Sequence, residues 1–430
     1  MNTTGPAVST QATAAPPTEA ERAAALQLLP MVWGIHISRA IYAVAELGIA
    51  DLLAAGPASS AELSRATGTH EPSLYRVLRL LAALGVFAEP EPRRFELTLL
   101  GDRLRSDAPA GMRSWAMLLE TIGGIRPFEH ILDTVRTGKP GAGIALGTDI
   151  FSFFAQHPQN AARFDAAMSE RTAAYAPSVA RTYDFSGLRT VIDVGGGKGT
   201  LLVEILRRHP HLQGIVFEAP TVAARAEAVL DAADLGDRCE VLAGDFFTAV
   251  PPGADCYILA NVLHDWDDTR AVEILANCRR AMAGAGRVLI VERLIPDDPA
   301  DAVPTLLSDI NMLVITGGQE RTNDEYGALL AAAGLRLTAV RPVAAPYGVI
   351  EGRPAAASRA PYSSFARSCP PVMTSMLMSL SRVGNAPAGS PVMSRSTIST
   401  RPAPAIARRH LPRISTARAS SQSCRTLARM

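Results

Sequence analysis

Apolar side chains recur every three or four positions over much of the first 180 residues, which is the period of helices with one buried face. The spacing is regular in LLPMVWGIHISRAIYAVAELGI, residues 28–49. It predicts helix from Glu21 onward with a stop at Gly48, because glycine commonly ends helices. We therefore expect a helical domain to follow a polar leader.

Between residues 57 and 98 the pattern becomes helix, turn, helix and wing. Ser59 with Glu62 predicts the N-terminal cap of a short helix. A second helix is predicted over PSLYRVLRLLAALG, and the segments 86–87 and 94–98 alternate like a two-stranded wing. The second helix of such a motif commonly enters the major groove of DNA. Here it is mostly Leu, Val and Ala, so we expect it to be buried against another subunit.

From Leu188 the chain alternates short apolar runs with amphipathic helices such as Thr269–Ala283. This alternation is typical of an α/β fold with a doubly wound parallel sheet and helices on both faces. Only four residues join the last two strands, too few for a helical crossover, so we expect the last strand to be antiparallel. The predicted strands are Thr190–Val194, Gly214–Glu218, Cys239–Ala243, Cys256–Ala260, Arg287–Glu292, Leu335–Pro342 and Tyr347–Glu351.

Composition narrows the class of protein. The 430 residues, 48% of them hydrophobic, suffice for two or three domains with their own cores. No run of roughly 18 uninterrupted apolar residues is present, and the N-terminus lacks the pattern of a signal peptide. The five cysteines show no CxxC spacing, which fits a reducing compartment and predicts no zinc site. We expect a cytoplasmic protein without a membrane span.

Charge is distributed unevenly along the chain. Twelve of the 42 basic residues and none of the 41 acidic residues lie from Arg353 onward, so residues 1–352 carry a formal charge of −11. An acidic body of this kind is poorly suited to nucleic acid or an anionic membrane surface. We expect neither as a partner of the folded part.

A glycine-rich segment, DVGGGKGT, connects a predicted buried strand to a helix. Its glycines allow a tight turn and close approach to a ligand, which makes Asp193, Gly195 and Gly197 candidate cofactor-binding residues. Gly-rich strand–helix turns also hold pyrophosphates, and a tight turn without a ligand is the alternative. The spacing is not that of a phosphate-binding P-loop.

Two further acids follow the next strands. Glu218 ends the second strand, 21 residues after Gly197, where a carboxylate can bind both ribose hydroxyls of an adenine nucleoside. Asp245 precedes Phe246 in GDFF, so the carboxylate could bond an adenine amino group while the ring packs against its face. The alternatives are a solvated acid and core phenylalanines. Taken together, the acids favour S-adenosyl-L-methionine over NAD.

The motifs VIDVGGGKGTL, GDFF, NVLHDWDD, VERLIP and GGQERTNDEY occur in this order. With them the sequence resembles the metal-independent, plant-type O-methyltransferases and their bacterial natural-product relatives, from about Ala24 to Pro354. The resemblance implies a winged-helix dimerisation domain and a Rossmann-like, seven-stranded methyltransferase domain. It also implies a homodimer, S-adenosyl-L-methionine as cofactor, a small hydroxylated aromatic, polyketide or isoprenoid acceptor, and no metal.

His264 lies just past the fourth strand, at the edge where doubly wound sheets bind ligands. By the resemblance, His264 is the general base that deprotonates the acceptor hydroxyl, and Glu292 and Glu320 orient and support it. Imidazole, with an unperturbed pKa near 6.5, is neutral enough at pH 7 to accept a proton. Taken singly, a structural histidine and surface acids are the alternatives.

The resemblance also aligns Phe164, Met168 and Met312 with positions that line the acceptor pocket. Core packing at helical spacing is the alternative, and methionine suits both roles. Two positions depart from the family. Glu218 replaces a commoner Asp, and Ala260 stands where many relatives carry a polar or basic side chain, so cofactor contacts at Ala260 would use the backbone.

The predicted function is therefore transfer of a methyl group to a hydroxyl. Two rivals remain: a cofactor-binding relative with a non-methylating activity, and a ligand-sensing DNA-binding regulator. We expect a disordered leader over 1–20, a winged-helix dimerisation domain over 21–108, a helical linker lining the acceptor pocket over 109–180, a cofactor-binding domain over 181–354, and a disordered, dispensable basic tail over 355–430.

Overall fold

The computed structural model describes residues 17–109 and 111–355. The tail and most of the leader predicted from the sequence lie outside these residues. Within the described part, residues 17–20 are already ordered, because Thr18 caps a helix that begins at Glu19 and forms a capping box with Glu21. The helix thus includes Glu19 and Ala20, which the sequence assigned to the leader.

The N-terminal domain packs four of its five helices around a small core that includes Leu63, Leu78 and Phe95, while the first helix buries no residue. The predicted helical segment from Glu21 to Gly48 is helical, but it is divided at Trp33, whose backbone is not helical. Gly48 takes the left-handed conformation after the second helix, as expected. The helices are α1 (Glu19–Val32), α2 (Gly34–Glu46), α3 (Ile49–Ala54), α4 (Ser60–Thr67) and α5 (Glu71–Ala83).

The predicted cap and wing are confirmed. The Ser59 side chain accepts a hydrogen bond from the Glu62 backbone, and the Glu62 carboxylate bonds back to Ser59. The wing strands β2 (Phe87–Glu91) and β3 (Arg94–Leu97) are antiparallel, and β1 (Ala58–Ser59) adds a third strand. The domain thus has the helix–turn–helix–wing order.

One helical stretch, Glu19–Glu46, is long and apolar enough to cross a membrane by length and composition, with a mean hydropathy of 1.3 and 17% of its window buried. No such span was predicted, because the stretch lacks roughly 18 uninterrupted apolar residues. Leu26, Met31 and Trp33 are exposed there. Apolar residues of this kind also form the faces by which soluble domains associate.

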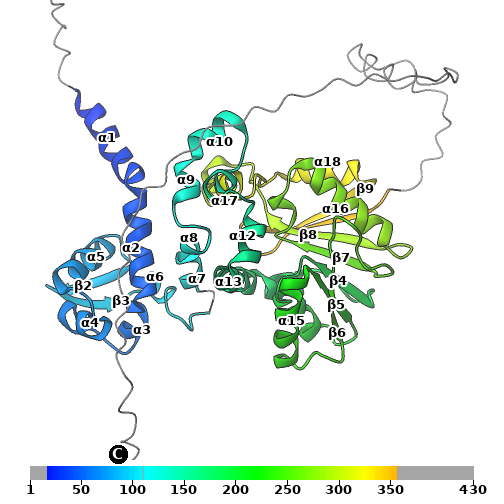
Figure 1. The fold of residues 1–430 in the computed structure, drawn as a ribbon, viewed down its shortest axis with the longest axis horizontal. Helices are drawn as coiled ribbons and strands as arrows, with labels where there is room; N and C mark the ends of the chain where they lie inside the picture. Colours follow the sequence, from blue (N-terminus) through cyan, green and yellow to red (C-terminus); the bar gives the residue numbers. More distant parts are fainter. Residues whose placement is uncertain (1–16, 110, 356–430) are drawn as a thin grey trace, which may run out of the picture. The chain divides into compact units, whose positions relative to one another are not determined.

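Short helices connect the two domains and precede one long helix (Figure 1). The long helix, α13 (Pro158–Thr182), carries 25 residues with Pro177 inside it. The short helices are α6 (Leu99–Asp102), α7 (Arg113–Ala116), α8 (Leu118–Thr121), α9 (Arg126–Glu129), α10 (Ile131–Thr137), α11 (Gly141–Leu146) and α12 (Ile150–Gln156).

The C-terminal domain contains a seven-stranded sheet of order β6-β5-β4-β7-β8-β10-β9. All seven predicted strands are present. The strands are β4 (Thr190–Val194), β5 (Gln213–Glu218), β6 (Cys239–Ala243), β7 (Cys256–Ala260), β8 (Arg287–Arg293), β9 (Leu335–Pro342) and β10 (Tyr347–Pro354). The last strand is antiparallel, as predicted, and it pairs with both β9 and β8. It therefore lies inside the sheet rather than at its edge.

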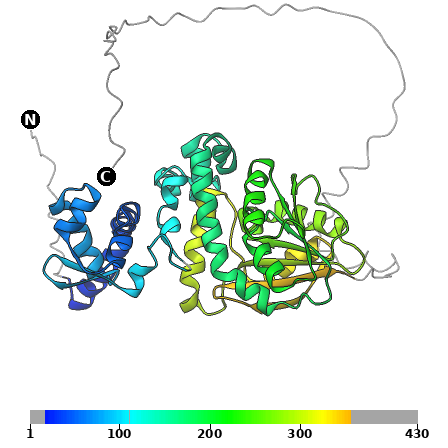
Figure 2. The same ribbon diagram turned by 90° about the horizontal axis from the view of Figure 1, so that it is seen from below.

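Helices cover both faces of this sheet, as Figures 1 and 2 show. On one face α13, α14 (Thr200–Arg208) and α15 (Pro220–Ala232) share a core with alternate strand residues. On the other face α16 (Asp268–Ala281) and α18 (Asn323–Ala332) do the same. A further helix, α17 (Pro299–Ile315), contributes Val314 and Ile315 to a smaller core with residues of α11 and α12. This architecture leaves the carboxyl ends of β4, β5, β7 and β8 available for a site.

Candidate functional site

The glycine-rich segment turns sharply after β4. Gly195 and Gly197 have φ values of +70° and +57°, a region that favours glycine. A Cβ on Gly195 would lie 2.8 Å from Val262 Cγ2 and 3.7 Å from Phe246 Cε1, whereas a Cβ on Gly197 would meet nothing within 4 Å. The backbone at Gly197 is thus open to a ligand, while Gly195 is closely packed.

Two of the predicted carboxylates flank this turn. Glu218 accepts backbone hydrogen bonds from Gly197 at 2.9 Å and Ala219 at 2.7 Å. Asp193 is buried, and its Oδ1 has no hydrogen-bond partner. Burial, followed by the charge of Glu218, raises the pKa of Asp193 to about 7. The pKa of Glu218 is also raised, chiefly by burial.

The third predicted acid lies differently. Asp245 is exposed and accepts hydrogen bonds from the Phe247 backbone at 2.9 Å and the Thr248 hydroxyl at 3.2 Å. Its carboxylate thus caps its own turn. Phe246 and Phe247 are half-buried beside Trp266, with ring centroids 6.2 Å and 4.7 Å from the indole. The aromatic surface lies next to the glycine turn as predicted, but the carboxylate has a structural partner in its own loop.

His264 lies in a 3-10 turn, Leu263–Asp265, directly after β7, and its side chain is 2% exposed. Its Nδ1 lies 3.2 Å from Glu292 Oε2 and 3.3 Å from Glu320 Oε1, although Nδ1 forms no well-aligned hydrogen bond. Its Nε2 is 3.9 Å from Asp265 Oδ1. The imidazole therefore has two carboxylates on one nitrogen, and its other nitrogen is free of close partners among the described residues.

Each of the two glutamates is held by other groups. Glu292, on β8, accepts backbone hydrogen bonds from Val262 and Leu263, each at 3.0 Å, through Oε1. Glu320 accepts a hydrogen bond from the Ser308 hydroxyl at 2.7 Å. Their orientations are therefore fixed before any substrate binds. The neighbouring-strand argument brings Glu292 to His264 as predicted, and the loop after α17 brings Glu320.

Burial alone would lower the pKa of His264. The charges of Glu292, Asp265 and Glu320 outweigh that effect and raise this pKa to about 9. Burial, offset in part by His264, raises the pKa of Glu292 to about 7. For Glu320, burial is outweighed by its contact with His264, which lowers its pKa. The imidazole is therefore more fully protonated at pH 7 than an unperturbed histidine would be.

Sequence reasoning missed two arginines, of which Arg321 is buried and Arg171 is half-buried. Arg321 is 1% exposed and donates to the carbonyls of Leu263 at 3.0 Å and Trp266 at 2.8 Å, so it fixes the turn that carries His264. Arg171, on α13, has a buried Nε without a partner and lies close enough to Asp265 for their charges to interact. Arg321 belongs to the GGQER motif, so the sequence contained a signal for it. No motif includes Arg171.

The residues aligned with the acceptor pocket come from two helices. Phe164 packs against Phe154, with ring centroids 4.6 Å apart, beside the core that contains Val314. Met168 is half-buried on α13, and Met312 is buried on α17. Ala260 is half-buried at the end of β7. These positions permit the predicted contacts, and Phe164 also belongs to the packing of the domain.

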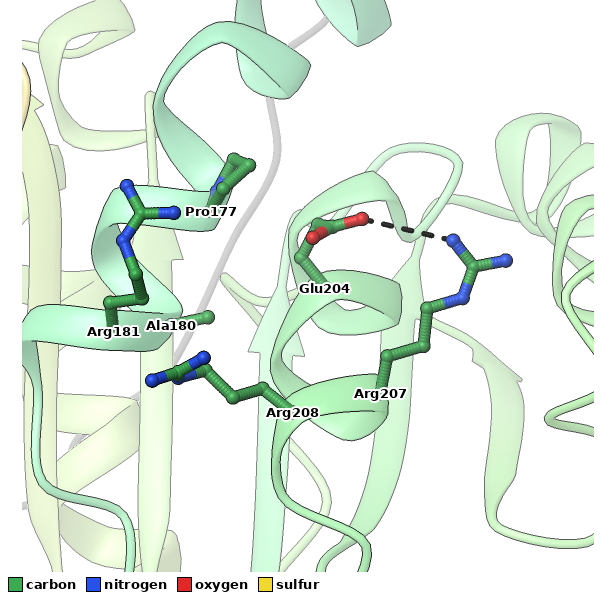
Figure 3. A pocket seen from close by; sticks show the side chains of 6 residues that line it. All are labelled: Pro177, Ala180, Arg181, Glu204, Arg207 and Arg208. Carbon is green, nitrogen blue, oxygen red and sulfur yellow. Dashed lines mark ion pairs between the residues drawn. The ribbon is translucent and has the colours of Figure 1, made fainter.

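A separate cavity of about 260 Å³ lies between α13 and α14. Arg181 and Arg208 project toward it, and Glu204 pairs with Arg207 nearby (Figure 3). Arg181, Arg207 and Arg208 stand in the last turns of their helices, where cations offset the negative end of the helix dipole. No predicted site residue lines this cavity, so it is distinct from the site around His264.

Among the described residues, His264, Glu292 and Glu320 also offer atoms within 4.8 Å of one another, a spacing that could hold a metal ion. Glu292 Oε1 is already bonded to backbone N–H groups. The distances from Nδ1 to the two carboxylates are those of ion pairs that share a proton. The arrangement therefore suits a general base whose imidazole is held by two carboxylates.

Comparison with known proteins places these features in a family. The profile of the O-methyltransferase domain matches residues 128–336, and that of the O-methyltransferase dimerisation domain matches residues 30–107. Phenazine O-methyltransferase PhzM of Lysobacter antibioticus is 43% identical over 78% of this chain and 99% of its own length. The chain belongs to this O-methyltransferase family.

Solved structures agree with that assignment. Mitomycin 7-O-methyltransferase MmcR superposes with a TM-score of 0.73 at 38% identity, covering 79% of this chain and all of that one. NcsB1 from neocarzinostatin biosynthesis, solved with S-adenosylmethionine and a naphthoic acid, has a TM-score of 0.65 at 36% identity and covers 74% and 96%. The similar proteins also include aclacinomycin 10-hydroxylase RdmB of Streptomyces purpurascens, 37% identical over 73% of this chain and 85% of its own length. This protein is an S-adenosylmethionine-dependent O-methyltransferase.

Buried polar atoms without partners show that the residues fit this cofactor. Asp193 Oδ1, Asn261 Oδ1 and Arg171 Nε are buried and unpaired among the described residues. Tyr175 lies near all three, since its hydroxyl accepts from Asn261 at 2.6 Å and interacts with the charges of Arg171 and Asp193. An amino-acid group would supply the complementary ammonium and carboxylate, and Glu218 suits a ribose.

Proposed function

We propose that this enzyme methylates a hydroxyl of a small aromatic or polyketide acceptor and that His264 is its general base. The observation that carries the proposal is the buried imidazole, held through Nδ1 by Glu292 and Glu320 while Nε2 stays free of close partners. The relatives named for phenazine, mitomycin and naphthoic acid substrates support an acceptor of this class.

The chain's own groups perform the proton transfer. When bound, S-adenosylmethionine supplies an activated methyl group. His264 Nε2 takes the proton of the acceptor hydroxyl, while the carboxylates at Nδ1 fix the tautomer and stabilise the imidazolium that forms. General-base help of this kind contributes about 10²–10⁴ in rate. Asp193, Glu218 and the open backbone at Gly197 would hold the cofactor, and Phe246 would pack beside its adenine.

The pKa of about 9 limits this base. Two pH units below it, about one imidazole in a hundred is neutral. His264 must lose its proton before it can accept one from the acceptor. The fraction of enzyme with a neutral imidazole therefore increases as the pH rises. The two carboxylates thus make the base strong and keep it protonated at neutral pH.

Replacement of His264 tests the proposed base. His264→Ala should lower kcat by about 10²–10⁴ and leave the Kd of S-adenosylhomocysteine nearly unchanged by calorimetry, with an acceptor that stays protonated at the assay pH. His130→Ala is the matched control. His130 also pairs with an acid, since its Nδ1 lies 3.1 Å from Asp133 Oδ2, but it is partly exposed and precedes α10. Wild-type turnover in His264→Ala would refute the assignment. EDTA should leave the wild-type rate unchanged.

The resemblance to a hydroxylase makes a non-methylating activity the second candidate. An enzyme that hydroxylates consumes dioxygen, whereas methyl transfer yields S-adenosylhomocysteine in proportion to product. Measuring both during turnover with a panel of phenolic and polyketide acceptors separates the two activities. The complete arrangement of His264, Glu292 and Glu320 favours methyl transfer.

We also infer a cytoplasmic homodimer. The dimerisation profile covers residues 30–107, and large apolar side chains are exposed on α1, α10 and α17, including Met31, Val135 and Leu307. A second copy of the chain would cover such faces. In a dimer, the partner would cover the apolar α1–α2 stretch, so that stretch need not enter a membrane. The partner would also cover the apolar second helix of the winged motif, which then need not bind nucleic acid.

A further inference from the structure

Helix α13 crosses the carboxyl edge of the sheet. Near its C-terminal half, Tyr175 bonds Asn261 after β7 and stacks on Tyr347 of β10 at 4.3 Å. Toward its N-terminus, Asp165 pairs with Arg225 of α15, which begins two residues after Glu218. The helix therefore spans the edge from β10 to α15, on the side where Asp193 and Glu218 would bind the cofactor.

The two halves of α13 are anchored to different parts of the protein. Ala176 and Val179 are buried in the core that α13 shares with α14. Farther toward the N-terminus, Asn160 donates to the Thr121 carbonyl of α8 at 2.9 Å, and Glu170 accepts from the Ser114 backbone at 2.9 Å. The N-terminal half is thus bonded to the short helices that precede it rather than to the sheet domain.

One polar contact joins that half to the sheet domain beside the cofactor residues. Arg225 Nε donates to Asp165 Oδ2 at 2.6 Å, with side chains 33% and 11% exposed. Among residues 17–109 and 111–355, no other hydrogen bond or ion pair connects α13 with α15. Lys198 of the glycine-rich turn lies close enough for its charge to act on Asp165, and Arg225 acts in the same way on Glu218.

We propose that the Asp165–Arg225 ion pair holds α13 against α15 and thereby sets the rate at which the cofactor and its product leave. Asp165 and Arg225 are positioning residues, since neither is placed in contact with the reacting atoms. The proposal rests on the assignment of Asp193, Gly197 and Glu218 to the cofactor. A charged pair that is partly shielded from water contributes more than a fully exposed one, so its loss should be measurable.

The test is the dissociation rate of S-adenosylhomocysteine from the full chain, measured by displacement in a stopped-flow fluorimeter. Asp165→Asn and Arg225→Met should each raise this rate about tenfold or more. The double variant with Asp165→Arg and Arg225→Asp restores opposite charges and should recover most of the wild-type rate. Glu204→Gln is the control, because it removes an ion pair with Arg207 on α14, away from the site.

The outcomes separate the ion pair from a general structural role. The melting temperature of each variant is measured in parallel, and rescue of the dissociation rate by the charge swap supports the pair itself. High salt should also speed dissociation from the wild type, which tests the pair even where a single variant does not fold. Unchanged dissociation rates in both single variants would overturn the proposal. So would a charge-swapped double variant that releases the ligand faster than either single variant. A wild type that binds no S-adenosylhomocysteine would instead refute the cofactor assignment.

Discussion

The imidazole of His264 shows how burial and charge compete at a single residue. Its pKa of about 9 lies above the ordinary 6.5, because three carboxylates outweigh the cost of burying a cation. A group whose folded pKa is raised contributes stability that is complete below pH 6.5 and is lost as the pH rises toward 9. The same proton that stabilises the fold must be absent for His264 to act as a base.

The pH dependence of turnover tests this arrangement. For an acceptor whose hydroxyl titrates above pH 10, kcat/KM of the wild type should rise with pH with a midpoint near 9, since it reports the free enzyme. Glu320→Gln removes one of the charges that raise the His264 pKa, so the midpoint of this rise should move to lower pH. A midpoint that stays in place in Glu320→Gln would show that Glu320 does not act on His264.

At the scale of elements, two loops from distant parts of the sequence fix the site together. Gly318 lies directly against the turn that carries His264, and the Gln319 backbone donates to the His264 carbonyl at 2.9 Å. Arg321 bonds carbonyls of the same turn and the carboxylate of Asp268 at the start of α16. The position of the imidazole therefore depends on this loop as much as on β7.

Gly318→Ala tests that dependence. Its new Cβ would overlap the His264 carbonyl oxygen and lie 2.8 Å from the Trp266 nitrogen, so the turn must move. We expect a loss of about 1–3 kcal/mol in the free energy of unfolding and a lower kcat. Gly327→Ala on α18 is the control, because its Cβ would meet only Leu337 at 3.6 Å. Equal kcat in the two variants would contradict the role of the loop.

Local and long-range information differ in what they predict. Capping by Ser59, the strand positions and the approach of Glu292 to His264 follow from residues close in sequence and from the parallel order of neighbouring strands. The burial of Arg321 and the half-buried position of Arg171 do not, because arginine is ordinarily exposed and only tertiary contacts bury it. Asp245 stays a predicted cofactor residue, and its carboxylate also accepts hydrogen bonds within its own turn.

At the scale of the whole molecule, the exposed apolar faces predict association. Met31→Glu and Leu307→Glu each place a charge where the wild type exposes 75% and 68% of an apolar residue. Each should shift the protein from dimer toward monomer in analytical ultracentrifugation, since burying an unpaired charge is costly. A dimer that survives both substitutions would show that another surface holds it.

The predicted tail can be tested by shortening the chain. All predicted site residues precede residue 355, and β10 ends at Pro354. A protein that ends at residue 355 should therefore keep its melting temperature and its rate of methyl transfer. Loss of either would show that the remaining residues, which lie outside the described part, support the enzyme.

The interior place of β10 has a consequence for synthesis on the ribosome. Strand β8 pairs with β7 on one side and needs β10 on the other, but β10 is the last strand of the sheet to be translated. Until residue 354 has left the exit tunnel, the nascent chain presents the open edge of β8, and such edges invite pairing with other chains. The strand that carries Glu292 therefore gains its second neighbour only after every other strand of the sheet has been translated, so the catalytic centre is among the last parts of this domain to assemble.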